Sequence, residues 1–473
     1  MKKTYKNIAY VALQQFVMSV LPFLTIPYLA RILGVKNNGY LAYSLSVSNI
    51  FLVIFSLGFL VYGMNEIAKS NKKETEIIYI ELQVVRFILL LLGAIIYFLF
   101  CNSYSFPGGK LIYFAQGLLI FAAVFDNSWY YQGIGDFKKV VSRNIIIKLI
   151  GNLSVFIFVK DSNDLLLYIL IINISQLLGN LILFFDNCIF FKQFKEMRIK
   201  RFKKHIWISF ILFIPNFSSL LFSNFDRIVL GATKDIVGLS NYFQSQRLIT
   251  FLYSFLMIPS PVIIQKIAKL RGQENNHEGD EMIRKGLNFY IVLSIWMYGF
   301  LVIFSKFIVN IMFGEEYTSA SIILIILGPI LITKTIGGVL GGWYLIPLGK
   351  NYTHSFPLLI TTILCIILNL IFTPLYGVIA AVYIFLFCEI LVLSIQIYIS
   401  PAFLKFIERE SFSLIAMNIF LVILIKFSII KLAIGYKDYL LNILFILSYL
   451  SIFSYFFVKA KKINLNKIFL MKR

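Results

Sequence analysis

Long unbroken blocks of apolar residues constrain this chain more than any other feature of its sequence. Segments such as 206–231 and 377–400 exceed the roughly 20 residues with which a helix crosses a hydrocarbon core of about 30 Å. Backbone polar groups find no water there, so each block must form a helix or part of a closed barrel. The blocks do not alternate with a period of two, which argues against a barrel. The sequence therefore predicts an all-α, polytopic membrane protein.

Composition and charge agree with this prediction. Of 473 residues, 59% are hydrophobic and only 14% are charged, which is more apolar surface than a soluble domain could hide. A net charge of +22 would suggest nucleic acid in a soluble protein. Here the basic loops of a membrane protein explain the charge, so no nucleic-acid partner is expected. The four cysteines lack CxxC or metal-ligand spacing, so we expect neither a disulfide framework nor a metal site.

Hydropathy predicts about fourteen spans, and the basic residues orient them. The spans fall near 8–33, 40–63, 82–101, 111–131, 141–159, 164–186, 206–231, 238–264, 286–305, 318–345, 352–373, 377–400, 412–430 and 439–458. With the N-terminus inside, the inner segments hold 30 Lys and Arg, with Arg143 at the start of span 141–159 counted among them, and the outer segments hold 7. The positive-inside rule then places both termini in the cytoplasm. The N-terminus lacks a cleavable signal pattern, so the first span is retained. The predicted location is the cell membrane, or the inner membrane of a Gram-negative cell.

The two halves of the chain begin alike. Each segment has a proline early in the span and, near its end, an arginine with a glycine three or four residues later: LPFLTIPYLARILG and FIPNFSSLLFSNFDRIVLG. Arg31 and Gly34 end the first segment, and Arg227 and Gly231 end the second. Both spans run outward, which is typical of a parallel repeat about an axis along the membrane normal. We therefore expect two pseudo-symmetric six-helix lobes around a central cavity, plus two C-terminal helices.

This repeat sets the predicted domain boundaries. They are an N-terminal lobe at 1–186, a basic cytoplasmic linker at 187–205, a C-terminal lobe at 206–400, and two extra helices with a basic tail at 401–473.

Several basic residues lie at bilayer depth, where a lone charge costs roughly 2.5–3.5 kcal/mol. Arg247 shares a helical face with Ser240, Gln244, Thr250 and Ser254. Lys148 and Lys334 lie near polar residues and glycines of their own spans. We expect all three to line the cavity, and Arg31 and Arg227 to lie at its rim; snorkelling to the headgroups is the alternative. Arg86 and Lys426, near span ends, are expected to snorkel.

Two carboxylates are candidates for ion coupling. Glu389 lies in the middle of a span and could bind and release a proton or hold Na⁺. The alternative is a structural pair with a buried Lys or Arg. Asp126 lies five residues from the inner end of span four, in DNSWYYQGIGDFKK, and could instead be a helix-end carboxylate at the interface. Bases outnumber acids at depth, and a cationic cavity suits an anionic substrate, especially a diphosphate.

Four segments resemble the polysaccharide flippase family of the multidrug/oligosaccharidyl-lipid/polysaccharide exporter superfamily. They are LPFLTIPYLARILGVKNNGY, FDNSWYYQGIGDFKKVVSRN, NFDRIVLGATKDIVGLSNYFQSQRL and GGVLGGWYLIPLGKN. The resemblance implies movement of undecaprenyl-diphosphate-linked oligosaccharide repeat units to the outer leaflet for O-antigen, capsule or exopolysaccharide assembly. It also implies alternating access coupled to H⁺ or Na⁺, with no other cofactor, and a lumen that includes Arg31, Asp126 and Arg227. Expected partners are the lipid-linked oligosaccharide, membrane lipids, a polysaccharide polymerase and a chain-length regulator.

Three other functions remain open from the sequence. A multidrug or cation antiporter of the same superfamily would have an acidic lumen, which is opposite in sign to the one predicted here. A membrane glycosyltransferase or polymerase would need paired carboxylates on a sizeable external loop, and Glu315 and Glu316 lie on a short one. A structural scaffold would not explain the polar helix faces. The chain is therefore expected to be a transporter and not an enzyme.

Overall fold

The computed structural model describes residues 2–187, 194, 196–431, 438 and 441–451 of the chain. Its helices are α1 (Lys2–Ser56), α2 (Phe59–Lys69), α3 (Lys72–Ser103), α4 (Lys110–Val124), α5 (Ser128–Gly133), α6 (Phe137–Phe158), η1 (Ser162–Asp164), α7 (Leu165–Asp186), η3 (Ile199–Arg201), α8 (Phe202–Ala232), α9 (Ile236–Leu256), α10 (Ser260–Gly272), α11 (Asn276–Met312), η4 (Glu315–Tyr317), α12 (Ala320–Leu327), α13 (Pro329–Gly338), the π-helix η5 (Val339–Leu345), η6 (Ile346–Leu348), α14 (Asn351–Ile399), η7 (Pro401–Phe406) and α15 (Arg409–Lys431). Parts of the predicted linker 187–205, of span 439–458 and of the region 401–473 lie outside the described residues.

Two glycines divide the longest helices into pairs of spans. Within the described residues, ten helices are long and apolar enough to cross a membrane, or eleven if α9 and α10, bent by 44°, form one span. Gly34 (φ 72°, ψ 173°) breaks α1, and Gly377 (φ 61°, ψ −143°) breaks α14. Only glycine adopts such angles cheaply. These two breaks, together with the short apolar helix Leu441–Ser451, accommodate the fourteen predicted spans. The predicted all-α, polytopic fold is confirmed.

The chain forms two compact units. Unit 1 contains Met1–Gln244 and His354–Cys388, and unit 2 contains Ser245–Thr353 and Glu389–Arg473. Helices α9 and α14 therefore contribute residues to both units. The predicted lobes at 1–186 and 206–400 follow from the sequence repeat and remain a prediction.

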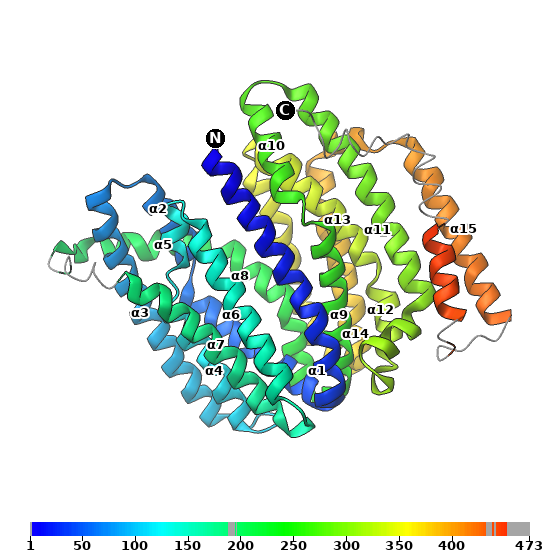
Figure 1. Cartoon of the computed structure of the whole chain (residues 1–473), viewed down its shortest axis with the longest axis horizontal. Helices are drawn as coiled ribbons and strands as arrows, with labels where there is room; N and C mark the ends of the chain where they lie inside the picture. Colours follow the sequence, from blue (N-terminus) through cyan, green and yellow to red (C-terminus); the bar gives the residue numbers. More distant parts are fainter. Residues whose placement is uncertain (1, 188–193, 195, 432–437, 439–440, 452–473) are drawn as a thin grey trace. The chain divides into compact units, whose positions relative to one another are not determined.

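In unit 1, α3, α4, α6 and α7 run side by side (Figure 1). On α3, Ala94 and Tyr97 are buried against neighbouring helices, whereas Ile95 and Leu99 are exposed. A membrane helix can expose such an apolar face because the surrounding lipid is as apolar as the side chains. The exposed isoleucines and leucines of this bundle therefore fit a lipid-facing surface.

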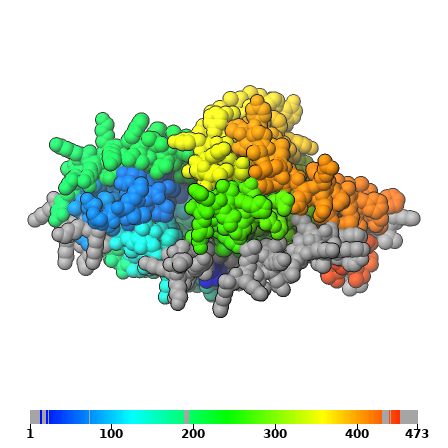
Figure 2. Space-filling view, turned by 90° about the horizontal axis from the view of Figure 1, so that it is seen from above, coloured from blue at the N-terminus to red at the C-terminus, as the bar shows by residue number. Residues whose placement is uncertain are grey.

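An aromatic core closes one end of unit 1, where α2 and α5 pack together and α8 begins. Phe59 of α2, Tyr79 of α3 and Trp129 of α5 are buried there. The rings of Tyr79 and Trp129 stack with their centroids 5.6 Å apart. Figure 2 shows the α2–α3 region in blue between the green start of α8 and the cyan α5 segment. This packing fixes the short helix α5, which has too few residues to be stable by itself.

Unit 2 is built around α11, which contacts α12, α13 and α15. Trp343 of the π-helix η5 packs edge-on against Tyr290 of α11, with ring centroids 5.5 Å apart. Tyr449 donates hydrogen bonds to the Trp296 carbonyl (2.9 Å) and to Asn418 Oδ1 (2.6 Å). These bonds tie the predicted last two spans to α11.

Candidate functional site

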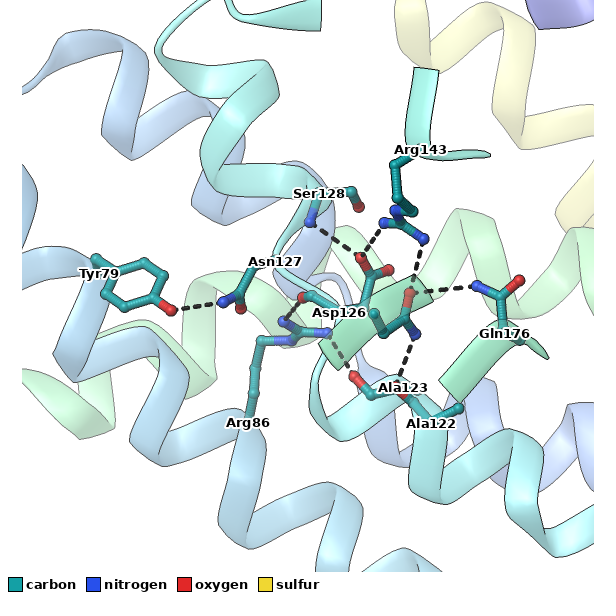
Figure 3. A network of polar contacts seen from close by, with 10 residues as sticks. Tyr79, Arg86, Ala122, Ala123, Asp126, Asn127, Ser128, Arg143 and Gln176 are labelled. Carbon is teal, nitrogen blue, oxygen red and sulfur yellow. Dashed lines mark hydrogen bonds and ion pairs between the residues drawn. The ribbon is translucent and has the colours of Figure 1, made fainter. Parts of the chain in front are cut away.

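Asp126 lies where the predicted fourth span breaks between α4 and α5. Its Oδ1 accepts a hydrogen bond from the Ser128 backbone N–H (2.9 Å) and lies 3.7 Å from Nη2 of Arg143 (Figure 3). A carboxylate at this position satisfies an N–H at the start of α5 that has no intrahelical partner. The Asp126 side chain therefore caps the start of α5. Its predicted role in ion coupling remains a prediction.

Arg86 of α3 is buried, with 1% of its surface exposed, so the prediction that it snorkels is wrong. Its Nη1 donates to the Asp126 carbonyl (2.7 Å) and its Nη2 donates to the Ala123 carbonyl (3.2 Å). Asp126 lies between α4 and α5, so its carbonyl belongs to neither helix, and the guanidinium donates to it. The Ala123 carbonyl accepts the Asp126 backbone N–H (3.2 Å) in addition to the guanidinium. The position of Arg86 near a span end predicts snorkelling, but hydropathy does not report which face of a helix is covered by neighbouring helices.

Arg143 of α6 extends the same cluster to α7. Its Nη1 donates to Asn180 Oδ1 (2.8 Å), and Asn180 Nδ2 donates to the Ala122 carbonyl (2.7 Å). Gln176 also donates to Asn180 Oδ1 (3.3 Å). We call Arg86, Asp126, Arg143, Gln176 and Asn180 the unit 1 polar network. It joins α3, α6 and α7 around the break in span four and contains two guanidinium groups and one carboxylate.

Sequence reasoning did not single out Arg143, Asn180 or Gln176. The available signal was Asp126-Asn127-Ser128, a typical helix-start sequence inside an apolar span. Such a break exposes carbonyl groups that must find donors, and no hydropathy scale says which side chains provide them.

Unit 1 also holds three other basic residues that the sequence predicts in the cavity or at its rim. Lys148 of α6 is half-buried, and its carbonyl accepts a hydrogen bond from Asn152 (2.7 Å). Arg31 of α1 is exposed. Arg227 of α8 donates from Nη1 to Asn224 Oδ1 (3.3 Å), and its guanidinium carbon lies 4.9 Å from the centre of the Phe243 ring.

The parallel segments of the two halves end differently. Gly34 turns the chain after Arg31 with a positive φ, but Gly231 is part of α8, and Lys234 takes the left-handed conformation instead (φ 64°). Asp226, beside Arg227, is buried and accepts a hydrogen bond from the Tyr242 hydroxyl. Gly34 and Gly231, which occupy matching positions in the predicted repeat, therefore differ in backbone conformation.

In unit 2 the structure brings Lys334 and Glu389 together. Lys334 Nζ lies 2.8 Å from Glu389 Oε1. The side chain of Lys334 is 28% exposed and that of Glu389 is 9% exposed. The sequence identified both residues but placed them in different roles. The pairing agrees with the alternative that Glu389 has a basic partner.

Polar groups and glycines surround this Lys334–Glu389 pair. A Cβ on Gly338 would lie 2.9 Å from the Tyr253 hydroxyl, and one on Gly337 would lie 3.5 Å from Gln396 Oε1. The glycines thus leave room for polar heads from α9 and α14. The π-helix η5 starts directly afterwards, at Val339. π-helical turns are frequently found at functional sites, which makes this region the strongest candidate site of unit 2.

Arg247 is also in unit 2 and is half-buried. Along its predicted polar face, Ser240 and Gln244 are fully buried in unit 1, and Gln244 donates to Asn38 Oδ1 (3.1 Å). From Arg247 onward the face is more exposed, with Thr250 exposed and Ser254 half-buried. Unit 1 thus holds Arg31, Asp126, Lys148 and Arg227, and unit 2 holds Arg247, Lys334 and Glu389. A shared cationic chamber remains a prediction.

A family model described as polysaccharide biosynthesis protein matches residues 4–265, more than half of the chain. The chain belongs to the polysaccharide biosynthesis protein family. A relative from Shigella dysenteriae named "Putative O-antigen transporter" is 24% identical over 399 residues, which cover 82% of this chain and 97% of the relative. An Escherichia coli (strain K12) protein of the same name is 23% identical, covering 83% of this chain and 95% of the relative.

A solved structure has the same fold as this family member. The structure titled "Lipid II flippase MurJ, inward closed conformation" covers 96% of this chain and 99% of its own, with a TM-score of 0.73 and 18% identity. The fold is therefore that of a multi-pass membrane transporter. The predicted resemblance to the polysaccharide flippase family is confirmed.

Proposed function

We propose that this family member is a flippase that moves undecaprenyl-diphosphate-linked oligosaccharide repeat units from the inner to the outer leaflet of the cell membrane. The product would serve O-antigen, capsule or exopolysaccharide assembly beside a polymerase and a chain-length regulator. Family membership and the transporter fold support movement of a lipid-linked polysaccharide precursor. We further propose that both termini lie in the cytoplasm, which the distribution of Lys and Arg supports.

The Lys334–Glu389 pair is the observation that carries this proposal. Both residues belong to predicted membrane spans, where an ammonium in contact with lipid would be costly. Lys334 is nevertheless three times as exposed as its partner, at 28% against 9%. A partly exposed ammonium at this depth fits a water-filled surface. It is also a point charge that can bind a phosphate oxygen.

This pair offers a simple scheme for ion coupling. With Glu389 ionised, Lys334 is held by the carboxylate at 2.8 Å. A proton or Na⁺ on Glu389 would remove that attraction and let Lys334 attract the diphosphate more strongly. Binding of the ion and binding of the substrate would then favour each other, which is a coupling free energy between two sites. Arg247 would add a second cationic contact from α9, and alternating access of two lobes would expose the site to each side in turn.

Deleting the gene tests the proposed function. We expect loss of surface polysaccharide together with accumulation of lipid-linked repeat units inside the cell. The measurement is mass spectrometry of the extracted lipid-linked pool beside an immunoblot of the surface polysaccharide. Normal surface polysaccharide in the deletion strain would overturn the proposal.

Substituting the pair tests the coupling scheme. Lys334→Ala should lower transport at least tenfold, because one lost phosphate contact of a charged group is worth about 1.5–3 kcal/mol. Glu389→Gln should still bind substrate but lose the dependence of transport on the ion gradient. Transport into proteoliposomes, with and without imposed H⁺ and Na⁺ gradients, measures both. Lys426→Met is the matched control, since it removes another half-buried lysine of unit 2 whose Nζ donates to the Val302 carbonyl (3.2 Å). Gradient-dependent transport by Glu389→Gln would contradict the scheme.

A further inference from the structure

A cleft in unit 1 is lined by none of the predicted site residues and by no member of the unit 1 polar network. It has a volume of about 520 Å³. Its lining comes from the start of the second half of α1, the loop before α4, and the turn between α8 and α9. The lining includes Lys36, Tyr40, Tyr104, Phe106, Lys234 and Asp235. All of these segments are predicted to lie on the outer side of the membrane.

An exposed tyrosine on a rigid aromatic support forms one wall of the cleft. Tyr104 is 46% exposed, whereas Phe106 beneath it is buried. Their ring centroids are 4.6 Å apart, and Phe106 stacks on Tyr113 at 4.1 Å. A large apolar face is thus held in place at the surface with little conformational freedom to lose on binding.

A second tyrosine faces the loop before α4. A Cβ on Gly108 would lie 2.7 Å from the Tyr40 ring, and Gly108 has a φ of 85°. Only glycine combines this angle with so close an approach. The loop therefore lies flat against Tyr40, which leaves the half-buried ring as part of the cleft lining.

The charged groups of the cleft have both signs. Lys36 and Lys234 contribute ammonium groups, and both side chains are exposed. Asp235 is half-buried, and its Oδ1 accepts a hydrogen bond from the Gly238 N–H (2.9 Å), which fixes the carboxylate at the start of α9. A carboxylate repels phosphate but accepts hydrogen bonds from hydroxyl groups. The charge pattern therefore favours a hydroxyl-rich ligand over a diphosphate.

We propose that this cleft binds the saccharide part of the translocated molecule on the outer side of the membrane. Sugar rings have an apolar C–H face, which matches Tyr104 and Tyr40, and a rim of hydroxyls, which matches the Lys and Asp side chains. A few polar groups on an apolar lining of this volume are typical of small-ligand sites. The inference rests on the proposed function, because that function supplies the saccharide and places it at this face.

The test uses the full-length protein in lipid nanodiscs and a defined probe. The probe is the free repeat-unit oligosaccharide, released by mild acid from the lipid-linked pool of the host, and binding is measured by saturation-transfer NMR. Wild-type protein should bind it saturably. Tyr104→Ala should weaken binding about tenfold, whereas Tyr104→Phe, which keeps the ring, should stay within about threefold. Lys234→Gly should also weaken binding, since glycine keeps the left-handed backbone while the ammonium and its alkyl chain are removed.

Two matched controls separate the cleft from the rest of the predicted outer surface. Tyr376→Ala removes an exposed tyrosine of unit 1 outside the cleft, and Lys160→Ala removes an exposed lysine outside it. Both should bind the oligosaccharide like wild type. Inorganic pyrophosphate is the second probe, and it should not compete with the oligosaccharide.

The outcomes distinguish this inference from the proposed function. Wild-type affinity in Tyr104→Ala, no binding to wild-type protein, or competition by pyrophosphate would each overturn the saccharide site. The deletion strain judges the flippase separately. If lipid-linked units accumulate there while Tyr104→Ala binds normally, the flippase stands and the saccharide site falls.

Discussion

At the scale of single residues, the unit 1 polar network shows what a buried base does in this protein. Arg86 donates two hydrogen bonds to the Asp126 and Ala123 carbonyls at the break in span four. Removing this buried charged donor costs both hydrogen bonds, at about 1–3 kcal/mol. A lysine at this position would restore only part of the geometry, since an ammonium cannot reproduce the planar fork of a guanidinium.

We therefore predict that Arg86→Met lowers the stability of the detergent-solubilised protein by about 2–3 kcal/mol, with Arg86→Lys in between. Thermal unfolding followed by size-exclusion chromatography measures the change. Lys160→Ala, an exposed lysine, provides the control and should leave the midpoint unchanged. Equal midpoints for Arg86→Met and wild type would show that the network contributes nothing to stability.

At the scale of the element, one glycine separates two spans that would otherwise form a single helix. Gly34 has φ 72° and ψ 173°, a region that is open essentially to glycine alone. Gly34→Ala should therefore destabilise the protein by about 1–3 kcal/mol and reduce the folded yield in membranes. Fluorescence-detected size-exclusion of tagged variants measures that yield.

Gly272→Ala is the matched substitution for this test. Gly272 is the last residue of α10, and a Cβ there would meet no atom within 4 Å. It should leave the yield unchanged. If both alanine variants fold equally well, the turn at residue 34 does not depend on glycine.

At the scale of the whole molecule, the fourteen predicted spans and the basic loops predict which loops lie on each side of the membrane. Ser162 lies in a predicted outer loop and Gln273 in a predicted inner loop, and both are exposed. In intact cells an impermeant maleimide should label Ser162→Cys and not Gln273→Cys, and permeabilised cells should label both. Wild-type protein gives the background from the native cysteines. Labelling of Gln273→Cys in intact cells would reverse the proposed orientation.

The sequence predicts correctly the features that depend only on whether lipid or water surrounds a segment. Hydrophobic length and the lack of water in lipid make every long apolar block a helix, so the all-α polytopic fold followed from single segments such as 206–231. The same cost of buried charge identified Lys334, Glu389 and Arg247 as unusual. Both inferences use properties of one segment at a time.

Partners of side chains could not be predicted in this way. The 2.8 Å contact between Lys334 and Glu389 joins residues 55 positions apart in the chain. Arg86 of α3 donates a hydrogen bond to the carbonyl of Asp126, which lies between α4 and α5. Hydropathy reports how apolar a segment is but not which of its faces meets which neighbour. For that reason Arg86 was predicted to snorkel and is instead buried.

The sequence by itself determined that this chain is a bundle of membrane-spanning helices, because lipid offers backbone groups no other partners. Only the tertiary structure decided which groups its charged side chains contact. It placed Arg86 at the break in span four and paired Lys334 with Glu389. It also gathered Tyr104, Lys234 and Asp235 into one cleft. The physical reason is that the energy of a charge or a ring depends on neighbours distant in sequence, and packing alone selects those neighbours.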